Sequence, residues 1–331
     1  MPLWFWVLII LGIDVTHVWS TLFRTYLDKE EFQTHKKLLI SAPLAGLLIF
    51  FALAFFSTAL FWTILAYLAV YHFLKQQYGF MQIYRAKYGF INLKKRISDK
   101  TAIYIGMLYP VFYWHLNHDR HFNWFIDGDF LNVREFLNNI PLWSDSVLSI
   151  INQTGTLLYF GILAYWLYEE ISIHQKHNLR FPWGKVLWVM TTAGNWYLGI
   201  IYFNSDLAFS LTNVVAHGVP YMALIFFYVE GKKQLKSKVT CYRVVINICL
   251  MISVIFVLAI GEEYLWDMFL FRENESFFSQ LFSYPFPAIQ TSLMQALALA
   301  MLSVPQVTHY ILDGFIWKAR TNPYVKTVIL Q

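Results

Sequence analysis

The stretch LWFWVLIILGIDVTHVWSTLFR, residues 3–24, decides the class of this protein. It is an almost uninterrupted apolar segment, and about 20 such residues are enough for a helix to cross the hydrocarbon core of a bilayer. No basic region precedes it and no small-residue cleavage site follows, so we expect a retained first span. Two ionisable residues, Asp14 and His17, lie within it. The segment therefore indicates both a membrane protein and a candidate site.

The composition of the whole chain agrees with this interpretation. Of 331 residues, 58% are hydrophobic and only 14% are charged, which excludes an ordinary soluble enzyme. The formal charge of +5 carries no nucleic-acid signature, and the two cysteines, Cys241 and Cys249, have no disulfide or zinc-knuckle spacing. No nucleotide-binding or serine-hydrolase motif is present either, so ATP-driven transport and serine hydrolysis lack sequence support.

Apolar windows bounded by charges or turn residues predict an all-α helical bundle that spans the membrane as a single domain over 1–331. The expected spans are 3–24, 38–56, 59–79, 101–117, 150–168, 185–203, 206–229, 241–261 and 288–317. Tight turns are expected at Ser57-Thr58 and at Asn204-Ser205-Asp206. A long acidic and aromatic loop over 118–149 should lie along the outer face, with a short interfacial helix near 133–139.

Lysine and arginine are concentrated in alternate loops. The loops after the first, third, fifth and seventh spans and the C-terminal tail are rich in basic residues, and the loops between them are poor. Because cytoplasmic loops retain Lys and Arg, the predicted topology has the N-terminus outside and the C-terminus in the cytoplasm. The expected location is a bacterial inner membrane.

Ionisable side chains recur in the odd-numbered spans, which all run in the same direction. They are Asp14, His17, His72, His217, His309 and Asp313. At about 1.5 Å per residue, most lie about 10 to 20 Å from the cytoplasmic charges. Ionisable groups are costly inside a membrane and are functional candidates by default. We therefore expect one shared site in the cytoplasmic half of the membrane.

The spacing of these residues suits metal binding. Asp14 and His17 are three residues apart, and His309 and Asp313 are four apart, so each pair shares a helix face. Imidazoles with carboxylates suit iron, zinc or manganese, and facing helices that carry both are typical of di-iron centres. The sequence thus predicts a metal site with iron, di-iron rather than mono-iron, and haem as a weaker option. The alternatives are interhelical hydrogen bonds for the histidines and ion pairs with Arg24 or Lys318 for the aspartates.

Other polar residues have helical spacing from these candidates or can face the same cavity. The expected supporting residues are Gln76, Asn195, Asn213, Tyr221, Gln306, Glu170 and Arg24, the last in a polar stripe with Thr21 and Asp28. Pro220 and Pro305 should bend their spans beside the site. A separate group, His115, His118 and His121, is expected at the outer end of the fourth span, as a zinc site or as a solvated segment.

Two families of membrane oxidases bear on these patterns. Membrane desaturases and hydroxylases carry adjacent histidine pairs, and this chain has none. Single histidines on several spans, with His17 on the first and His72 on the third, resemble the layout of bacterial carotenoid-cleaving membrane dioxygenases. The resemblance covers the arrangement of spans and transfers no residue role.

These observations favour a metal-dependent oxidoreductase that acts on a lipid-soluble substrate. Its expected partners are membrane lipids, a hydrophobic small molecule and an electron-donor protein on the cytoplasmic side, with no nucleic acid. No catalytic residue is assigned. The alternative is a transporter coupled to protons or metal ions, in which the same residues form a relay.

Overall fold

The computed structural model describes residues 2–88, 95–117, 121–236, 240–318 and 322–330. The protein is all-helical, with 80% of residues in helices and no strand in the described ranges. The helices are α1 (Leu3–Phe5), α2 (Thr16–Arg24), α3 (Lys29–Phe56), α4 (Thr58–Lys87), α5 (Asp99–His115), α6 (Val133–Asn138), α7 (Asp145–Lys176), α8 (Trp183–Trp196), α9 (Asp206–Phe209), α10 (Val215–Lys236), α11 (Cys241–Trp266), α12 (Glu275–Phe278), α13 (Ser292–Leu302) and α14 (Val304–Ile316). Wider π-helical turns extend or join them at Trp6–Val15, Tyr197–Tyr202, Ser210–Val214, Asp267–Phe271 and Val325–Ile329.

Six helical segments are long and apolar enough to cross a membrane. They are Leu3–Arg24, Lys29–Phe56, Thr58–Lys87, Asp145–Lys176, Asp206–Leu235 and Cys241–Phe271. Their lengths and composition are compatible with an integral membrane protein. The other three expected spans correspond to shorter or interrupted elements: α5, then α8 with the turn after it, and α13 with α14.

The interruption between α13 and α14 has a local cause. The last expected span, 288–317, breaks at Ser303 because Pro305 occupies the first turn of α14. The predicted bend before His309 is therefore confirmed, in the form of a helix break. The tight turns are confirmed too, with Ser57 between α3 and α4, and Asn204 in a left-handed backbone conformation (φ 45°).

The expected boundary of the eighth span was wrong. A span over 241–261 leaves Glu262 and Glu263 in the acidic loop that follows it, but α11 continues through both residues to Trp266. Charge alone suggested the end of the span at residue 261. The indole Nε1 of Trp19, which donates to Glu262 Oε2 at 2.6 Å, supplies one carboxylate with a partner within the helix.

Side-chain caps fix several helix starts. Asp28 accepts hydrogen bonds from the backbone N–H groups of Glu30 and Glu31, so α3 begins well before the expected start of the second span at residue 38. Ser98 and Ser144 cap α5 and α7 in the same way. The short helix expected near 133–139 is present as α6.

The helices form two compact units. The first contains Met1–Leu68 and Gly218–Ile329, and the second contains Ala69–His217. Both boundaries fall inside continuous helices, α4 and α10. Each unit thus has its own core, and two helices continue from one unit into the other.

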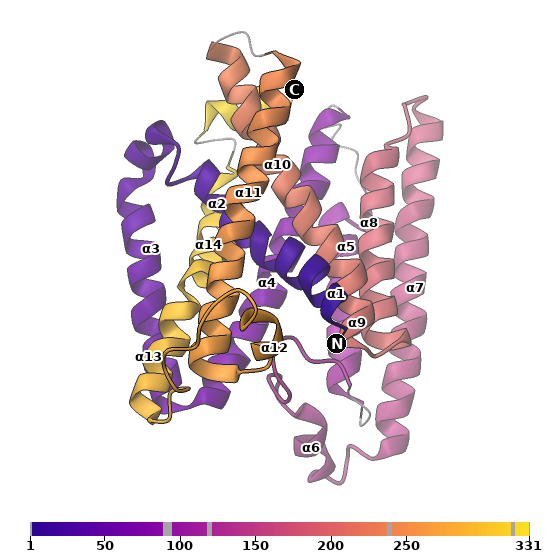
Figure 1. Cartoon of the computed structure of the whole chain (residues 1–331). Coiled ribbons are helices and arrows are strands. Elements are labelled where there is room, and N and C mark those ends of the chain that lie inside the picture. Colours follow the sequence, from indigo (N-terminus) through magenta and orange to yellow (C-terminus); the bar gives the residue numbers. More distant parts are fainter. Residues whose placement is uncertain (1, 89–94, 118–120, 237–239, 319–321, 331) are drawn as a thin grey trace. The chain divides into compact units, whose positions relative to one another are not determined.

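In the first unit, α3 lies along α13 and α14, and α2 packs on α11 and α14 (Figure 1). Leu39 and Ala42 of α3 are buried with Leu312 and Ile316 of α14. Gly46 allows a close approach, since a Cβ there would lie 3.0 Å from Val307 Cγ1. This packing anchors α14, the helix that carries His309.

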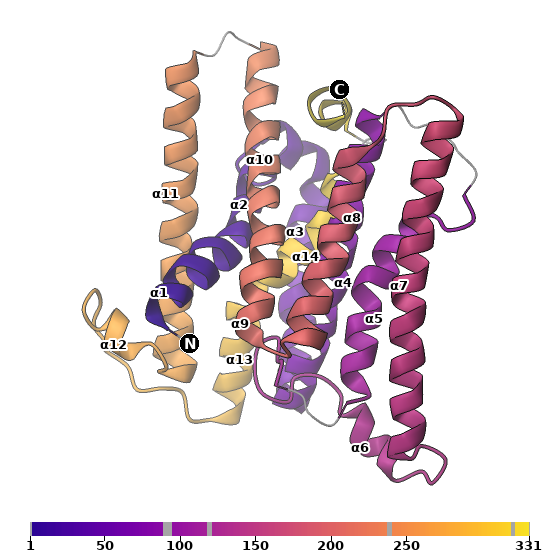
Figure 2. The same ribbon diagram turned by 90° about the vertical axis from the view of Figure 1, so that its right-hand side faces the viewer.

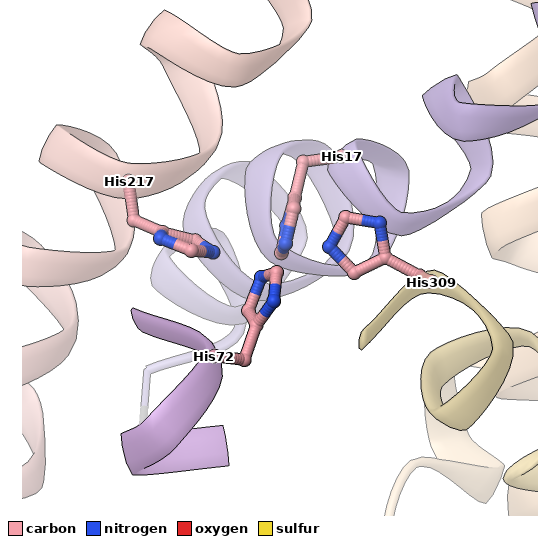
Figure 3. Close-up of side chains that lie close together, drawn as sticks. All are labelled: His17, His72, His217 and His309. Carbon is pink, nitrogen blue, oxygen red and sulfur yellow. The ribbon is translucent and has the colours of Figure 1, made fainter. Parts of the chain in front are cut away.

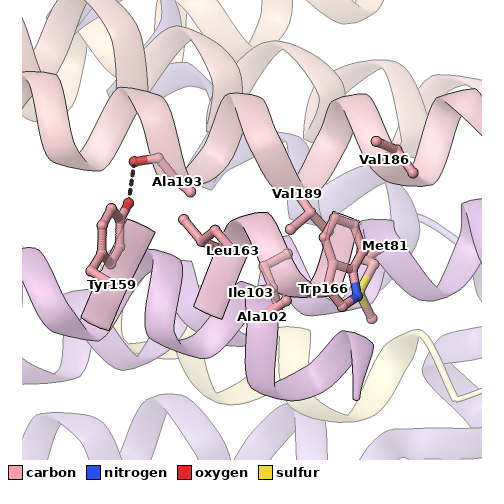
Figure 4. Packing of buried hydrophobic residues seen from close by; sticks show 9 residues of the cluster. All are labelled: Met81, Ala102, Ile103, Tyr159, Leu163, Trp166, Val186, Val189 and Ala193. Carbon is pink, nitrogen blue, oxygen red and sulfur yellow. Dashed lines mark hydrogen bonds between the residues drawn. The ribbon is translucent and has the colours of Figure 1, made fainter. Parts of the chain in front are cut away.

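In the second unit, α5 packs against both α7 and α8 (Figure 2). Their shared core contains Ile103 of α5, Leu163 and the fully buried Trp166 of α7, and Val189 of α8 (Figure 4). The Tyr159 hydroxyl donates to the Ala193 carbonyl at 2.9 Å, which links α7 to α8. These apolar and polar contacts hold three helices together beside α4.

Two prolines inside helices are accompanied by donors from other parts of the chain. Proline removes the hydrogen bond to the carbonyl four residues earlier. For Pro43 in α3 that carbonyl belongs to Leu39, and the Tyr26 hydroxyl donates to it at 2.7 Å. Pro110 in α5 leaves the carbonyl of Gly106, which accepts from the Tyr159 hydroxyl at 3.4 Å. Each freed carbonyl thus lies within hydrogen-bond distance of a tyrosine hydroxyl from another part of the chain, and Tyr159 shares its proton with the Ala193 carbonyl.

Candidate metal centre

His17 of α2 and His309 of α14 form a buried pair in the first unit (Figure 3). Their ring centroids lie 5.0 Å apart, with the planes at 81°. The two residues are only 2% and 1% exposed, so neither ring is solvated. Because the sequence separates these residues widely, the packing of α14 on α2 is what brings them together.

A polar contact orients the ring of His309. Thr21 Oγ1 lies 2.7 Å from His309 Nδ1 and 3.1 Å from the Tyr221 hydroxyl. The ring of Tyr221 also lies edge-on to both histidines, with centroids 6.0 Å from His17 and 5.0 Å from His309. With Nδ1 occupied by Thr21, Nε2 of His309 is the atom left for a ligand.

Gly218 allows α10 to lie close to Ile13 in the helical segment Trp6–Val15 and to His17 in α2. A Cβ on Gly218 would lie 2.7 Å from Ile13 Cγ2, 3.2 Å from the Ile13 carbonyl oxygen and 3.5 Å from His17 Cβ. Only glycine permits this approach without movement of Ile13. The residue before it in the same helix is His217, so the backbone that carries His217 continues directly from a contact with His17.

His217 pairs with His72 of α4 in the second unit. Their ring centroids lie 5.0 Å apart at 83°, and the residues are 0% and 3% exposed (Figure 3). Phe73 stacks on His217 with centroids 3.7 Å apart and planes within 5°. Trp196 and Phe209 pack around Phe73. This apolar surrounding excludes water from the pair.

Two glutamines of α4 hold the backbone around His217. Pro220 leaves the carbonyl of Ala216 without its helical partner. Gln77 Nε2 donates to that carbonyl at 3.4 Å, and Gln76 Nε2 donates to the His217 carbonyl at 2.9 Å. Gln76 was expected to support a histidine ring, but it binds this backbone oxygen. The glutamines thereby join the positions of His72 and His217.

The two predicted carboxylate ligands have other surroundings. Asp14 Oδ1 lies 3.6 Å from His17 Nδ1, and the Asp14 side chain is 36% exposed. Asp313 accepts a hydrogen bond from Trp317 Nε1 at 2.7 Å. Among the described residues, the group of side chains that could hold a metal ion consists of the four histidines and includes neither aspartate. Ligation by Asp14 or Asp313 remains a prediction.

Most of the expected supporting residues bind backbone or other side chains. Tyr221 lies beside the first histidine pair, as described above. Gln306 donates to the Tyr310 hydroxyl at 2.8 Å, whereas Asn195 donates to the carbonyl of Thr212 and Asn213 to that of Asn195. The two asparagines therefore join α8 to the turn that precedes α10.

Glu170 and Arg24 belong to separate ion pairs. Glu170 is fully buried in the second unit and pairs with Lys95 and Lys185. Arg24 pairs with Glu31 at 2.8 Å and donates to the Ile316 carbonyl at 2.8 Å. These contacts fix the ends of α2 and α7. They give no support to the alternative in which Arg24 would pair with Asp14 or Asp313.

The separate histidine group His115, His118 and His121 is placed only in part. His115 is buried, and its Nδ1 lies 2.6 Å from the Val111 carbonyl oxygen. The backbone N–H of His121 donates to Asn204 Oδ1 at 3.2 Å. His118 lies outside the described residues. No zinc-binding group is found here among the residues described.

Two contacts of the histidines were not expected from the sequence. Phe73 stacks on His217, and Thr21 contacts His309 across 288 residues of sequence. For Thr21, one sequence feature points to a role near the histidines, namely its position on the polar stripe of the first span. For Phe73, no sequence feature points to the contact with His217, because phenylalanine beside histidine is common in an aromatic-rich chain.

Comparison of the chain with protein-family models, with curated proteins and with solved structures finds no match.

Proposed function

We propose that the two histidine pairs together hold one metal ion within a membrane-embedded oxidoreductase. The observation that carries this proposal is the contact of Gly218 with His17. Within the first unit, that contact places the start of the α10 backbone beside the His17–His309 pair. His217 directly precedes Gly218 in the same helix, and in the second unit the ring of His217 pairs with the ring of His72. Chain continuity thus favours a single centre.

The donor set favours one ion. The proposed centre takes one ring nitrogen from each of the four histidines, two from each pair. Nitrogens bound to one ion at about 2.0 to 2.1 Å in a tetrahedron are about 3.4 Å apart. Di-iron centres in helical bundles rely on carboxylates, which this group lacks, so we propose a single iron ion in place of the expected pair. Zinc and manganese are the competing ions.

The surroundings suit oxidation of a hydrophobic substrate that enters from the lipid. Iron held by imidazoles supplies redox chemistry. The residues of this chain orient the histidine rings and exclude water from them. Thr21 fixes the ring of His309, Tyr221 lies against the first pair, and Phe73 covers His217. The same proposal includes nine spans with the N-terminus outside, a bacterial inner membrane and an electron donor on the cytoplasmic side.

Metal analysis of the purified full-length protein tests this proposal. Wild type is compared with the double variants His17→Ala/His309→Ala and His72→Ala/His217→Ala, with His177→Ala as the matched control at the exposed end of α7. Size-exclusion chromatography and circular dichroism verify that each variant is folded.

One shared centre predicts about one ion per chain in wild type and in the control, and none in either double variant. Two independent sites would each lose only their own ion, so partial retention in the double variants would refute the shared centre. Absence of bound metal from wild type after gentle purification would refute the metal function itself.

A second function, a proton or metal-ion relay, is favoured by one observation. Asp14 and Glu262 are additional carboxylates inside apolar helices of the first unit, beside His17 and Trp19 respectively. Groups that can exchange protons therefore extend beyond the histidines. Reconstitution into liposomes that contain a pH-sensitive dye tests this relay. A flux abolished by Asp14→Asn and Glu262→Gln would support it, and a wild-type flux equal to that of protein-free liposomes would exclude it.

A further inference from the structure

The second unit contains a large pocket that the metal centre does not use. Its volume is about 920 Å³, within the range of small-molecule binding sites. It is lined by Tyr84, Arg85, Lys87, Tyr88, Lys95, Ser98, Asp99, His174, Leu179, Arg180, Pro182, Gly184 and Lys185. The lining comes from the end of α4, the start of α5, the end of α7 and the start of α8. In the predicted topology all four helix ends are cytoplasmic.

The inner wall of the pocket is a buried ion network. Lys95 Nζ lies 2.8 Å from Asp99 Oδ1, and Lys185 Nζ lies 3.2 Å from Asp99 Oδ2. Both lysines also pair with Glu170, and Trp166 Nε1 donates to Asp99 at 3.0 Å. Two positive and two negative side chains balance each other here. The network therefore forms a charge-balanced wall of the pocket.

The outer lining is positive. Arg85, Lys87 and Arg180 contribute three cations, and the only carboxylate in the described lining is Asp99 of the inner wall. Lys87 and Arg180 are exposed, so a ligand from the aqueous phase or from a lipid headgroup layer can reach them. A pocket of this charge favours an anionic ligand.

Aromatic rings form one side of the pocket. The guanidinium of Arg180 lies over the Tyr88 ring, 5.9 Å from its centroid. Tyr84 packs directly on Gly184, where a Cβ would lie 2.5 Å from Tyr84 Cδ1. Glycine at 184 thus lets the Tyr84 ring approach the first turn of α8 closely. That turn has no side-chain cap at Pro182, so its N–H groups add to the positive character of the pocket.

We propose that this pocket binds a phosphate-bearing ligand. Arginine pairs with phosphate oxygens through two parallel N–H donors, and lysine adds a point charge. The phosphate would contact Arg85, Lys87 and Arg180, and the attached organic group would lie against Tyr84 and Tyr88. The source of the phosphate is either a lipid headgroup or a soluble phosphate compound. This site is independent of the metal centre.

The full-length protein in nanodiscs distinguishes the two sources. In discs of zwitterionic phosphatidylcholine, inorganic phosphate is titrated by calorimetry, with chloride as the reference anion. In discs that also contain phosphatidylglycerol, native mass spectrometry counts the lipids retained by the protein. Phosphate binding in the first experiment identifies a soluble ligand, and selective retention of phosphatidylglycerol in the second identifies a headgroup.

Arg180→Gln and Lys87→Gln should weaken either kind of binding at least tenfold. The matched control is Lys176→Gln, an exposed lysine at the end of α7 that does not line the pocket. Gly184→Ala should weaken binding by displacing Tyr84, with no change in lining charge. Metal content should stay at the wild-type level in all four variants, so this test fails or succeeds separately from the proposed function.

Two results would overturn the proposal. One is binding of neither phosphate nor phosphatidylglycerol above the chloride and phosphatidylcholine references. The other is an equal loss of binding in Lys176→Gln, which would indicate attraction by overall surface charge without a defined pocket.

Discussion

Substitution of Gly218 by alanine should move α10 away from the helical segment Trp6–Val15 and cause the proposed centre to lose its metal ion. The added Cβ would lie 2.7 Å from Ile13 Cγ2 and 3.2 Å from the Ile13 carbonyl oxygen. Carbon atoms in good contact are about 3.5 to 4.0 Å apart, so the two segments must move apart by about 1 Å. Overpacking of this kind costs about 1 to 3 kcal/mol, against a gain of about 1 kcal/mol from the helix propensity of alanine.

The effect on metal binding should exceed the effect on folding. Metal–ligand distances tolerate about 0.2 Å, several times less than the displacement required. We therefore expect Gly218→Ala to lose most of its metal while its thermal unfolding temperature falls by only a few degrees. Metal analysis and a thermal unfolding assay on the same detergent-purified sample measure both quantities.

Two further variants make this prediction specific. Gly314→Ala, in the helix that carries His309, adds a Cβ with no neighbour within 4 Å and should keep its metal. Ile13→Ala combined with Gly218→Ala removes the Cγ2 contact and should restore part of the metal. Full metal occupancy in Gly218→Ala alone would refute the argument that this contact positions the centre.

Three other predictions concern single contacts. Thr21→Val should weaken metal binding about 10- to 100-fold by removing the partner of His309 Nδ1, and Thr21→Ser should retain it, as competition with a chelator will show. Burial lowers the pKa of Lys95 to about 8, partly offset by Asp99, so phosphate affinity should fall as the pH rises through about 8 and Lys95 loses its charge. The charged groups that contact Lys95 or shift its pKa are Asp99, Glu170 and Lys185. In Lys95→Gln, calorimetry should show a weaker affinity that no longer changes over this pH range. Tyr26→Phe should destabilise the fold by about 1 to 3 kcal/mol, measured by thermal unfolding, because the Leu39 carbonyl loses its donor.

The sequence was sufficient to predict the helical class and the four histidines. A long apolar run leaves few alternatives to a membrane helix, and His17, His72, His217 and His309 stand out because ionisable groups are rare in such runs. The positions of turns followed from short polar interruptions such as Ser57. These features depend on local chemistry, which a sequence displays directly.

Other features depend on contacts between distant residues. Nothing local indicates that Thr21 contacts His309, or that Gln76 donates to the His217 carbonyl. Glu262 was misplaced because its charge suggested a loop, and its partner Trp19 is 243 residues away. The sequence does not indicate the pocket at the end of α4 for the same reason, since its lining residues come from four separate helix ends.

The prolines of α3, α5 and α10 have a consequence for how this sequence can change over time. Each proline leaves one backbone carbonyl without its helical hydrogen bond, and a side chain elsewhere in the chain donates to that carbonyl. These donors are Tyr26 for Pro43, Tyr159 for Pro110 and Gln77 for Pro220. While the proline is present, the donor is constrained, and once the proline is replaced the donor is free to vary. Related chains should therefore lose the members of each pair in a fixed order, with the proline first. Three pairs of columns in an alignment would then record the same physical dependence.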